Sequence, residues 1–335
     1  MTLPSTFKHI AVNEHSRAMT LAESPLTQPE GRNILIHVCA AGVNRADILQ
    51  QQGLYPPPAD ASPILGLEVS GTVAAIGPEV SQWAVGDRVC ALTHGGGYAD
   101  YCAIREDQCF SVPSSVALDQ AAGLPEALLT AWHNIFERGQ LKPNETLLIQ
   151  GGASGIGSIA VQMAKLWGAT VIATAGGDEK CNQVAALGAD TVINYREQDF
   201  VAVINEVTNH RGVDVVLDMI GGDYIQKHIQ IAALDGRIVN IAYQNGFSTP
   251  IDFLGVLLKR LTLSASTLRP QSFDRKASMI RAISEHFGRA IETGQLVPVI
   301  DSQFSLAQAS DAHAALLAGH HVGKLLLLPQ GNETE

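Results

Sequence analysis

The sequence has few cysteines, no long apolar run and no secretion pattern at its start. The five cysteines are an odd number without C-x-x-C spacing, so we expect no disulfide framework and a reducing compartment. No apolar run approaches the about 18 residues that a membrane helix needs, and the first residues lack the charged-then-apolar order of a signal peptide. We therefore expect a soluble, cytoplasmic protein.

Basic charge is also scarce. There are 22 Lys and Arg against 33 Asp and Glu, a formal net charge of −11. An acidic surface repels a phosphate backbone, which argues against nucleic acid as the main partner. The 335 residues are 46% hydrophobic and predict about two domains, each with its own core.

Residues 1–125 have the pattern of a compact antiparallel β domain. Short apolar segments separated by turn residues predict strands at 33–43, 67–76, 87–92 and 98–104, with a short helix at 46–52.

After Pro125 strands and helices alternate, which predicts a doubly wound parallel sheet over residues 126–272. A helix is expected at 126–138 and another at 274–293. Residues 273–335 break the alternation, so we assign them to the first domain. The expected strands are 146–150, 170–174, 191–194, 214–217, 237–241, 261–266, 299–302 and 322–328, and the other expected helices are 155–166, 179–187, 200–208, 224–233, 251–258 and 306–318.

A glycine-rich segment, GGASGIG at 151–157, lies between an expected strand and an expected helix. Glycines let the backbone approach a pyrophosphate, and the free N–H groups at a helix start hold it. Because the segment sits in a βαβ run, it predicts binding of a nicotinamide dinucleotide, with a purely structural turn as the alternative.

The end of the second strand distinguishes NADP from NAD. An NAD site usually has an acid there for the ribose 2′-OH, but this strand is followed by Gly176 and Gly177. Asp178 is expected to cap the next helix. Lys180 in that helix's first turn and Tyr195 after the third strand would suit a 2′-phosphate, so we favour NADP(H).

Two other chemistries are disfavoured. A catalytic zinc needs about three Cys, His or acidic ligands, but Leu67 stands where a ligating His would be expected, and the segment NRAD at 44–47 has neither Cys nor His. A hydrolase could use HGGG at 94–97 and Ser154, but the nucleophile turn G-x-S-x-G fails at Ile156. We expect no metal and no hydrolysis.

The chain resembles the zinc-independent medium-chain dehydrogenase/reductase superfamily, in particular the zeta-crystallin-like NAD(P)H:quinone oxidoreductases and their stress-induced subgroup. The resemblance runs through almost the whole chain. The matching segments, besides the glycine segment, are AGVNRAD (41–47), QQGLYPPP (51–58), GLEVSGTV (66–73), GDRV (86–89), GGGYAD (95–100), PEALLTA (125–131), TAG (174–176), NY (194–195), DMIGG (218–222), LDGR (234–237) and GK (323–324).

The resemblance implies an α/β protein with a GroES-like, β-rich catalytic domain and a Rossmann domain, with cofactor and substrate in the cleft between them. It implies catalytic roles for Tyr55 and Asn44 at the nicotinamide and substrate. The residues implied to bind the cofactor are Thr130, Gly152, Ser154, Gly155, Ile156, Gly157, Gly176, Lys180, Tyr195, Ile241, Ala242, Tyr243, Ser266, Thr267, Leu268, Gly323 and Lys324.

Two departures from the family pattern stand out. Gly177 replaces a frequent serine, which removes one expected phosphate hydrogen bond and weakens the NADP preference. Tyr243 is bulkier than the residue expected there, which would narrow the pocket.

The leading hypothesis is hydride transfer from NADPH to a quinone, an acceptor electrophilic enough to need no acid–base pair. Reduction of α,β-unsaturated carbonyls, with Tyr55 protonating the enolate, is the nearest alternative. A second class of protein would bind NADPH with little turnover. We also expect a homodimer formed by the edge strand at 261–266, whose unpaired groups invite pairing.

Overall fold

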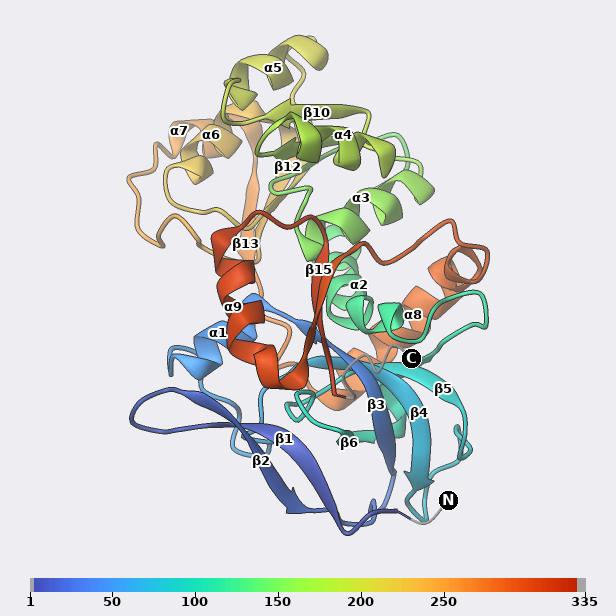
Figure 1. Ribbon diagram of the computed structural model, residues 1–335. Coiled ribbons are helices and arrows are strands. Elements are labelled where there is room, and N and C mark those ends of the chain that lie inside the picture. Colours follow the sequence, from blue (N-terminus) through green and yellow to red (C-terminus); the bar gives the residue numbers. More distant parts are fainter. Residues whose placement is uncertain (1–2, 330–335) are drawn as a thin grey trace. The chain divides into compact units, whose positions relative to one another are not determined.

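The computed structural model describes residues 3–329 and divides after Glu126 and after Leu268 into two compact units. The first unit combines the residues before the first division with those after the second, and the second unit lies between (Figure 1). Arg269 belongs to the first unit, where its side chain bonds to Gln50, so the second division falls four residues before the expected one.

A seven-stranded sheet forms the first unit's core, beside a separate β1–β2 hairpin. The tail returns to this sheet, because β15 pairs antiparallel with β3 and parallel with β14. The elements are β1 (Thr6–Val12), β2 (Met19–Pro25), β3 (Asn33–Val43), α1 (Arg45–Gln51), β4 (Glu68–Ile76), β5 (Arg88–Leu92), β6 (Tyr101–Arg105), β7 (Cys109–Ser111), α8 (Phe273–Glu292), β14 (Ile300–Ser305), α9 (Ala309–Ala318) and β15 (Lys324–Leu328).

The expected strands of this unit are confirmed, and β3 has the expected bounds. Three further strands, β1, β2 and β7, were not expected. β1 has only two buried residues, β2 has none and β7 has only three residues in all, so none shows a long apolar pattern. The HGGG glycines form a turn, where Gly95 and Gly96 have φ of +95° and +91°.

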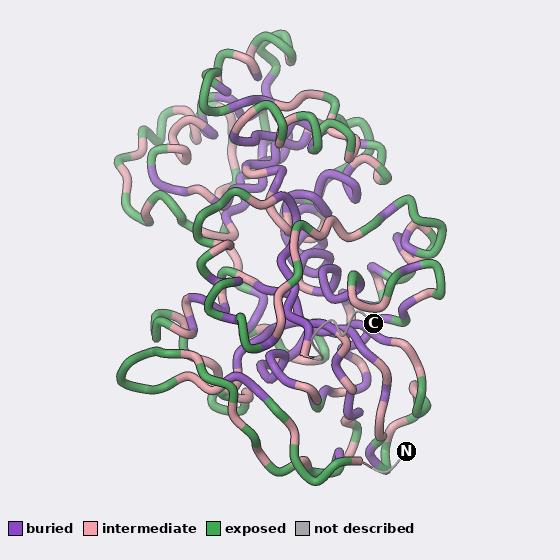
Figure 2. The backbone as a smooth tube through the Cα atoms, viewed as in Figure 1, coloured by how far each residue is buried: buried purple, intermediate pink, exposed green. Residues whose placement is uncertain are grey.

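The second unit is the expected doubly wound sheet, with six parallel strands in the order β10-β9-β8-β11-β12-β13. The four central strands, β9, β8, β11 and β12, are largely buried (Figure 2), as is typical of a sheet covered on both faces. The elements are α2 (Pro125–Ala131), β8 (Thr146–Ile149), α3 (Gly155–Leu166), β9 (Thr170–Ala175), α4 (Asp178–Ala186), β10 (Thr191–Asn194), α5 (Phe200–Val207), β11 (Val213–Asp218), α6 (Tyr224–Ile231), β12 (Ala232–Asn240), α7 (Leu254–Lys259) and β13 (Thr262–Ala265).

For one segment of this unit the expected type of helix is wrong. Residues 126–138 were expected to form one α-helix, but α2 ends at Ala131 and a π-helix runs over Trp132–Arg138. The apolar spacing that predicted the helix does not distinguish the two helix types. Within residues 3–329 no helix is long and apolar enough to span a bilayer.

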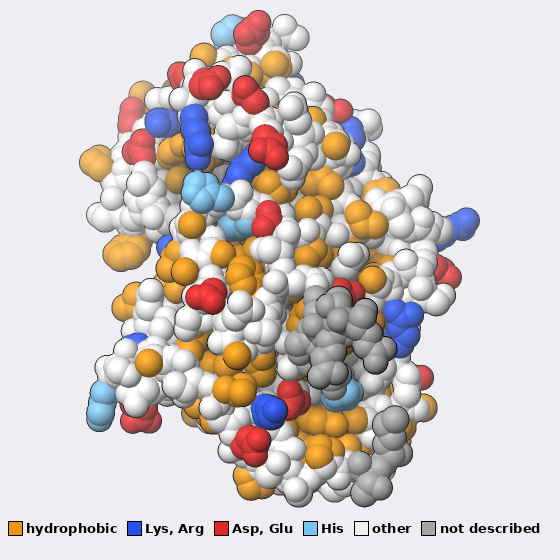
Figure 3. Space-filling view, in the orientation of Figure 1, with side chains coloured by type: hydrophobic (Ala, Val, Ile, Leu, Met, Phe, Trp, Pro, Cys, Tyr) orange, Lys and Arg blue, Asp and Glu red, His pale blue; other side chains and the backbone are white. Residues whose placement is uncertain are grey.

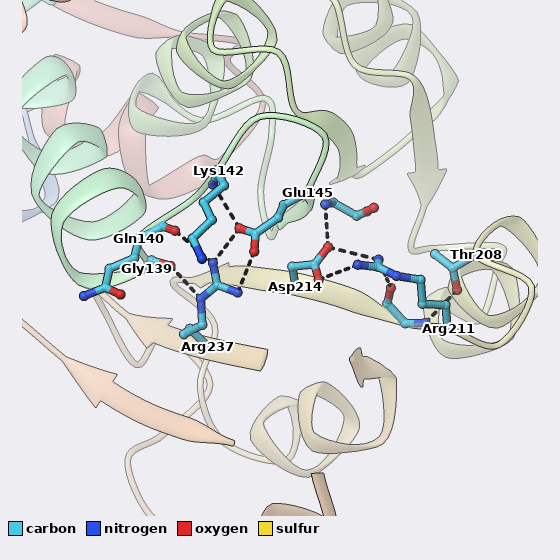
Figure 4. A network of polar contacts seen from close by, with 10 residues as sticks. Gly139, Gln140, Lys142, Glu145, Thr208, Arg211, Asp214 and Arg237 are labelled. Carbon is cyan, nitrogen blue, oxygen red and sulfur yellow. Dashed lines mark hydrogen bonds and ion pairs between the residues drawn. The ribbon is translucent and has the colours of Figure 1, made fainter. Parts of the chain in front are cut away.

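A polar network fastens the amino ends of three strands, away from the glycine segment (Figure 4). Arg237 on β12 donates to Glu145 before β8 and to the carbonyl of Gly139. Arg211 pairs with Asp214 on β11. These contacts hold one end of the sheet, so its carboxyl ends can carry functional loops.

Candidate functional site

The glycine segment leaves the carboxyl end of β8 and enters α3. Gly151 has a φ of +74°, and the N–H of Gly152 donates to the carbonyl of Thr174 over 2.8 Å. Ser154 is the N-cap, and its Oγ accepts the N–H of Gly157 over 2.9 Å. The N–H groups of Gly155 and Ile156, the first two of the helix, have no partner within it, so they are available to an anion at the positive end of the helix dipole.

Two of these glycines are needed for close packing. A Cβ on Gly157 would lie 2.2 Å from the carbonyl oxygen of Gly151, and one on Gly152 would lie 2.8 Å from the Cβ of Ala173. The loop therefore lies against its helix and the next strand with no room for side chains. This is the role that glycines have at a dinucleotide-binding turn.

A buried chain of side chains runs behind the loop. The N–H of Gly151 donates to Oγ1 of Thr174, whose hydroxyl donates to Oε1 of Gln150. Nε2 of Gln150 lies 2.9 Å from Nε2 of His228, and Nδ1 of His228 faces Oδ2 of Asp218 at 3.6 Å. The amide can only donate here, so the proton of a neutral imidazole is on Nδ1 and points at Asp218.

Asp218 connects this chain to the loop after β11. Its carboxylate accepts the N–H groups of Ile220 and Gly221 and the side-chain amide of Asn240. Burial lowers the pKa of His228 to about 3 and raises the pKa of Asp218 to about 6, against these three donors. The glycine loop and the loops after β11 and β12 are thus held by one network.

The end of β9 brings together two residues that were expected at a 2′-phosphate, Gly176 and Tyr195. A Cβ on Gly176 would lie 2.6 Å from the hydroxyl of Tyr195 and 3.1 Å from Nε of Arg196. Tyr195 and Arg196 are exposed, so both polar groups are accessible beside this glycine. Arg196 was not among the expected residues, although it directly follows Tyr195.

The neighbouring positions explain the missing serine. Gly177 has a φ of +103°, a conformation in which a serine would be strained. Its N–H donates to Oδ1 of Asn194, whose amide donates to Asp178. Asp178 is therefore engaged at the start of α4, and Lys180 lies half-buried in the first turn of the same helix.

Two loops at the other side of the sheet hold further expected residues. The N–H of Ile241 donates to the carbonyl of Asp218 over 2.8 Å, and Ala242 follows it. A Cβ on Gly221 would lie 2.6 Å from the Tyr243 ring, so this bulky side chain packs against a glycine. Whether it narrows a pocket stays a prediction.

Thr130 and the residues after β13 meet at one side chain. The amide of Asn134 donates to the carbonyl of Thr130 over 2.8 Å, and its oxygen accepts the hydroxyl of Ser266 over 2.6 Å. Asn134 belongs to the π-helix, a distortion frequent at functional sites. Thr267 is exposed and Leu268 is buried, directly after Ser266.

In the first unit, Asn44 and Lys324 are brought together across 280 positions of sequence. Nζ of Lys324 lies 2.6 Å from Oδ1 of Asn44 and 2.5 Å from Oε1 of Glu68. Glu68 is completely buried and also accepts the Asn44 amide and the N–H of Glu126. A Cβ on Gly323 would lie 2.2 Å from the carbonyl oxygen of Val299, so only a glycine leaves room for that backbone just before β15.

A second buried carboxylate lies beside this cluster. Asp47 accepts the N–H groups of Asn44 and Gly66 and the hydroxyl of Tyr98. Nε2 of His313 lies 3.1 Å from the same hydroxyl. Burial raises the pKa of Asp47 to about 6 and lowers the pKa of His313 to about 4.

Tyr55 lies in a different group of side chains. The guanidinium carbon of Arg269 is 5.6 Å from its ring centroid, and Nη1 of Arg269 donates to Oε1 of Gln50 over 2.8 Å. Nζ of Lys276 donates to the Arg269 carbonyl. Burial raises the pKa of the Tyr55 hydroxyl, which favours its protonated form. Among residues 3–329, no hydrogen bond joins Tyr55 to Asn44.

Metal-ligating side chains do not gather anywhere in the described part of the chain: no group of three or more His, Cys, Asp or Glu could hold a metal ion.

Family comparisons agree with both units. Residues 30–114 match the alcohol dehydrogenase GroES-like domain, and residues 155–285 match the zinc-binding dehydrogenase family. A 2-haloacrylate reductase from Burkholderia is 31% identical over 92% of the chain and 94% of its own length. The pig quinone oxidoreductase is 30% identical over 90% of each.

The chain belongs to the medium-chain dehydrogenase/reductase superfamily. Within it, the chain is a zeta-crystallin-like, quinone oxidoreductase type of oxidoreductase, as the resemblance implied. It is also 34% identical, over 95% of its length, to a phenolphthiocerol/phthiocerol polyketide synthase polypeptide of Mycobacterium tuberculosis, of which it spans only 14%.

Solved structures carry the same fold. Escherichia coli quinone oxidoreductase in complex with NADPH has a TM-score of 0.85 at 27% identity, covering 96% of this chain and 100% of that one. CurK enoyl reductase has a TM-score of 0.84 at 26% identity, covering 96% and 99%. The expected fold class is confirmed.

Proposed function

We propose that the protein transfers a hydride from NADPH to a quinone without a metal ion. The observation that carries the proposal is the contact of the Lys324 ammonium with Glu68 and Asn44. The ammonium occupies the side-chain oxygens that could otherwise bind a metal ion, and Leu67 has no imidazole to act as a further ligand. An acceptor that is already electrophilic suits such a site.

The cofactor fits the second unit's loops. The start of α3 would hold the pyrophosphate, while Arg196, Lys180 and Tyr195 would surround the 2′-phosphate beside Gly176. Bound NADPH would supply the hydride. Arg196 adds a cation that offsets the hydrogen bond lost with Gly177.

The acceptor would be positioned in the first unit. Burial keeps the Tyr55 hydroxyl protonated, so this hydroxyl would donate a hydrogen bond to the acceptor's oxygen. Asn44, held by Glu68 and Lys324, would orient the reacting partners without exchanging a proton. The quinone gains two electrons and one proton as hydride, and water supplies the second proton.

Reduction of enones is the second candidate, favoured by the likeness to an enoyl reductase and a 2-haloacrylate reductase. NADPH oxidation with ortho- and para-quinones, and with enones, in the presence and absence of a chelator, tests both. Turnover of quinones that survives chelation supports the first proposal, and turnover of enones alone favours the second.

An NADPH-binding protein with little turnover is the remaining class. Acidic and basic side chains intermingle on the face shown in Figure 3, which does not favour a nucleic-acid partner on that face. Tight NADPH binding without oxidation by either acceptor class would establish this alternative.

We further propose a cytoplasmic homodimer formed through β13. This strand is at an edge of its sheet, and α7 and the preceding loop expose large apolar side chains that a partner would cover. These are Phe247, Phe253, Leu254, Leu257 and Leu258. Light scattering should give a dimer mass that Leu257→Asp lowers, and a monomeric wild type would contradict the proposal.

A further inference from the structure

Arg269 is a buried cation with only one of its side-chain edges in use. The residue is 6% exposed. Nη1 donates to Oε1 of Gln50, whose amide nitrogen donates to the carbonyl of Pro63, so the guanidinium is held from one side. Its backbone carbonyl is held by Lys276. The side chain is thus fixed in place.

The other two nitrogens, Nε and Nη2, have no hydrogen-bond partner among residues 3–329. In a guanidinium these two N–H groups lie on one edge and point the same way, which is the geometry that binds both oxygens of a carboxylate. A buried charge with unsatisfied donors is costly. Its retention indicates that a ligand satisfies the edge in another state.

The surrounding charges include two cations. Lys276 is 2% exposed and its Nζ donates to the Arg269 carbonyl. The acids that act on Arg269 are Asp47 and then Glu126, and those that act on Lys276 are Glu126 and then Asp60. Burial and the charge of Glu68 raise the pKa of Glu126 to about 7. Near neutral pH the Glu126 carboxyl is therefore only partly ionised, so this acid balances the two cations only in part.

We propose that the Nε–Nη2 edge of Arg269 binds a carboxylate carried by the acceptor, so that the protein prefers acidic enones or quinones to neutral ones. This proposal rests on the proposed reductase function. The edge has no contact with solvent in this structure. The guanidinium lies over the half-buried Tyr55 ring, 5.6 Å from its centroid, so this edge adjoins the residue proposed to bind the acceptor's oxygen.

The matched acceptors are 4-oxopent-2-enoate and its methyl ester, which share one enone and differ in charge. For the wild type we expect kcat/KM to favour the acid. Arg269→Gln should lower kcat/KM for the acid at least 30-fold and for the ester less than threefold. Arg269→Lys keeps the charge without the bidentate edge, so its kcat/KM for the acid should lie between that of the wild type and that of Arg269→Gln. Arg260→Gln, which removes an exposed ion pair with Asp235, is the control.

A binding readout separates this inference from the function. Levulinate, the saturated acid that lacks the reducible carbon–carbon double bond, should raise the melting temperature of the wild type and not that of Arg269→Gln. Equal loss on acid and ester, or equal levulinate protection of wild type and variant, would overturn the inference. If neither quinones nor enones are turned over but levulinate protection still depends on Arg269, the proposed reductase function is wrong and the carboxylate site at Arg269 is retained.

Discussion

Replacing Gly157 with alanine should damage cofactor binding far more than it changes the helix. The new Cβ would lie 2.2 Å from the Gly151 carbonyl oxygen, and real Cβ contacts are essentially never under 3.0 Å. The loop must then move by about 0.8 Å. A misplacement of about 1 Å can lower a catalysed rate about 100-fold. We expect a comparable loss of affinity here, with the Kd for NADPH rising roughly 30- to 100-fold, which corresponds to about 2–3 kcal/mol of binding free energy.

The matched control is Gly288→Ala on α8. A Cβ there meets nothing within 4 Å. Alanine is favoured over glycine within a helix by roughly 0.5–1 kcal/mol, so this variant should melt slightly higher and bind NADPH normally. The same preference acts at Gly157, so any loss there comes from the clash with the loop.

The assay is titration of NADPH by calorimetry, with thermal unfolding of both variants in parallel. NADPH binding by Gly157→Ala as tight as that of the wild type would refute the reasoning, because the loop would then tolerate a displaced backbone. Loss of binding by Gly288→Ala as well would show a general effect of alanine.

Three further predictions test single side chains. Arg196→Glu should raise the KM for NADPH roughly 10- to 100-fold by removing a charged hydrogen bond and leave the KM for NADH nearly unchanged; equal effects would exclude a 2′-phosphate contact, and Lys180→Glu provides the comparison. Tyr55→Phe should lower kcat/KM about tenfold without lowering the melting temperature, as expected for one lost hydrogen bond; unchanged kinetics would remove Tyr55 from the reaction. Glu126→Gln should be more stable than the wild type above pH 7 and equally stable below about pH 4.5, because a folded pKa raised from 4.5 to about 7 makes the wild type lose stability as pH rises through this window, by up to about 3 kcal/mol. Unfolding free energies in urea at pH 4.5 and 8.5 check this, and a constant difference would contradict it.

Local patterns predicted most of the fold. Strands such as β3 and helices such as α3 have continuous apolar positions, and each was expected with its observed bounds. The π-helix at Trp132–Arg138 was not foreseen, because three- and four-residue spacing cannot reveal a wider turn. The hairpin of β1 and β2 was missed because only two of its residues, both on β1, are buried, so it has no clear apolar pattern.

The candidate site was predictable only where its chemistry is local. The glycine segment and the residues after β9 follow one another along the chain, so their order indicates a dinucleotide site. The sequence around Glu126 and around Arg269 contains no motif that indicates a role for either residue. Their importance comes from burial and from partners that a linear pattern cannot identify.

The charged clusters of the first unit require both ends of the chain. Lys324 reaches Asn44 across 280 positions, and Arg269 reaches Gln50 across 219. The second unit is one continuous segment, whereas the first closes only after the chain has returned to it. Closing so long a loop costs entropy that only the completed contacts offset. Without β15 the Glu68 carboxylate would be a buried charge lacking its cation, a strongly destabilising state. We therefore expect the second unit to fold first, and the contacts of Glu68 with Lys324 and of Gln50 with Arg269 to form only once the C-terminal segment has joined the first sheet.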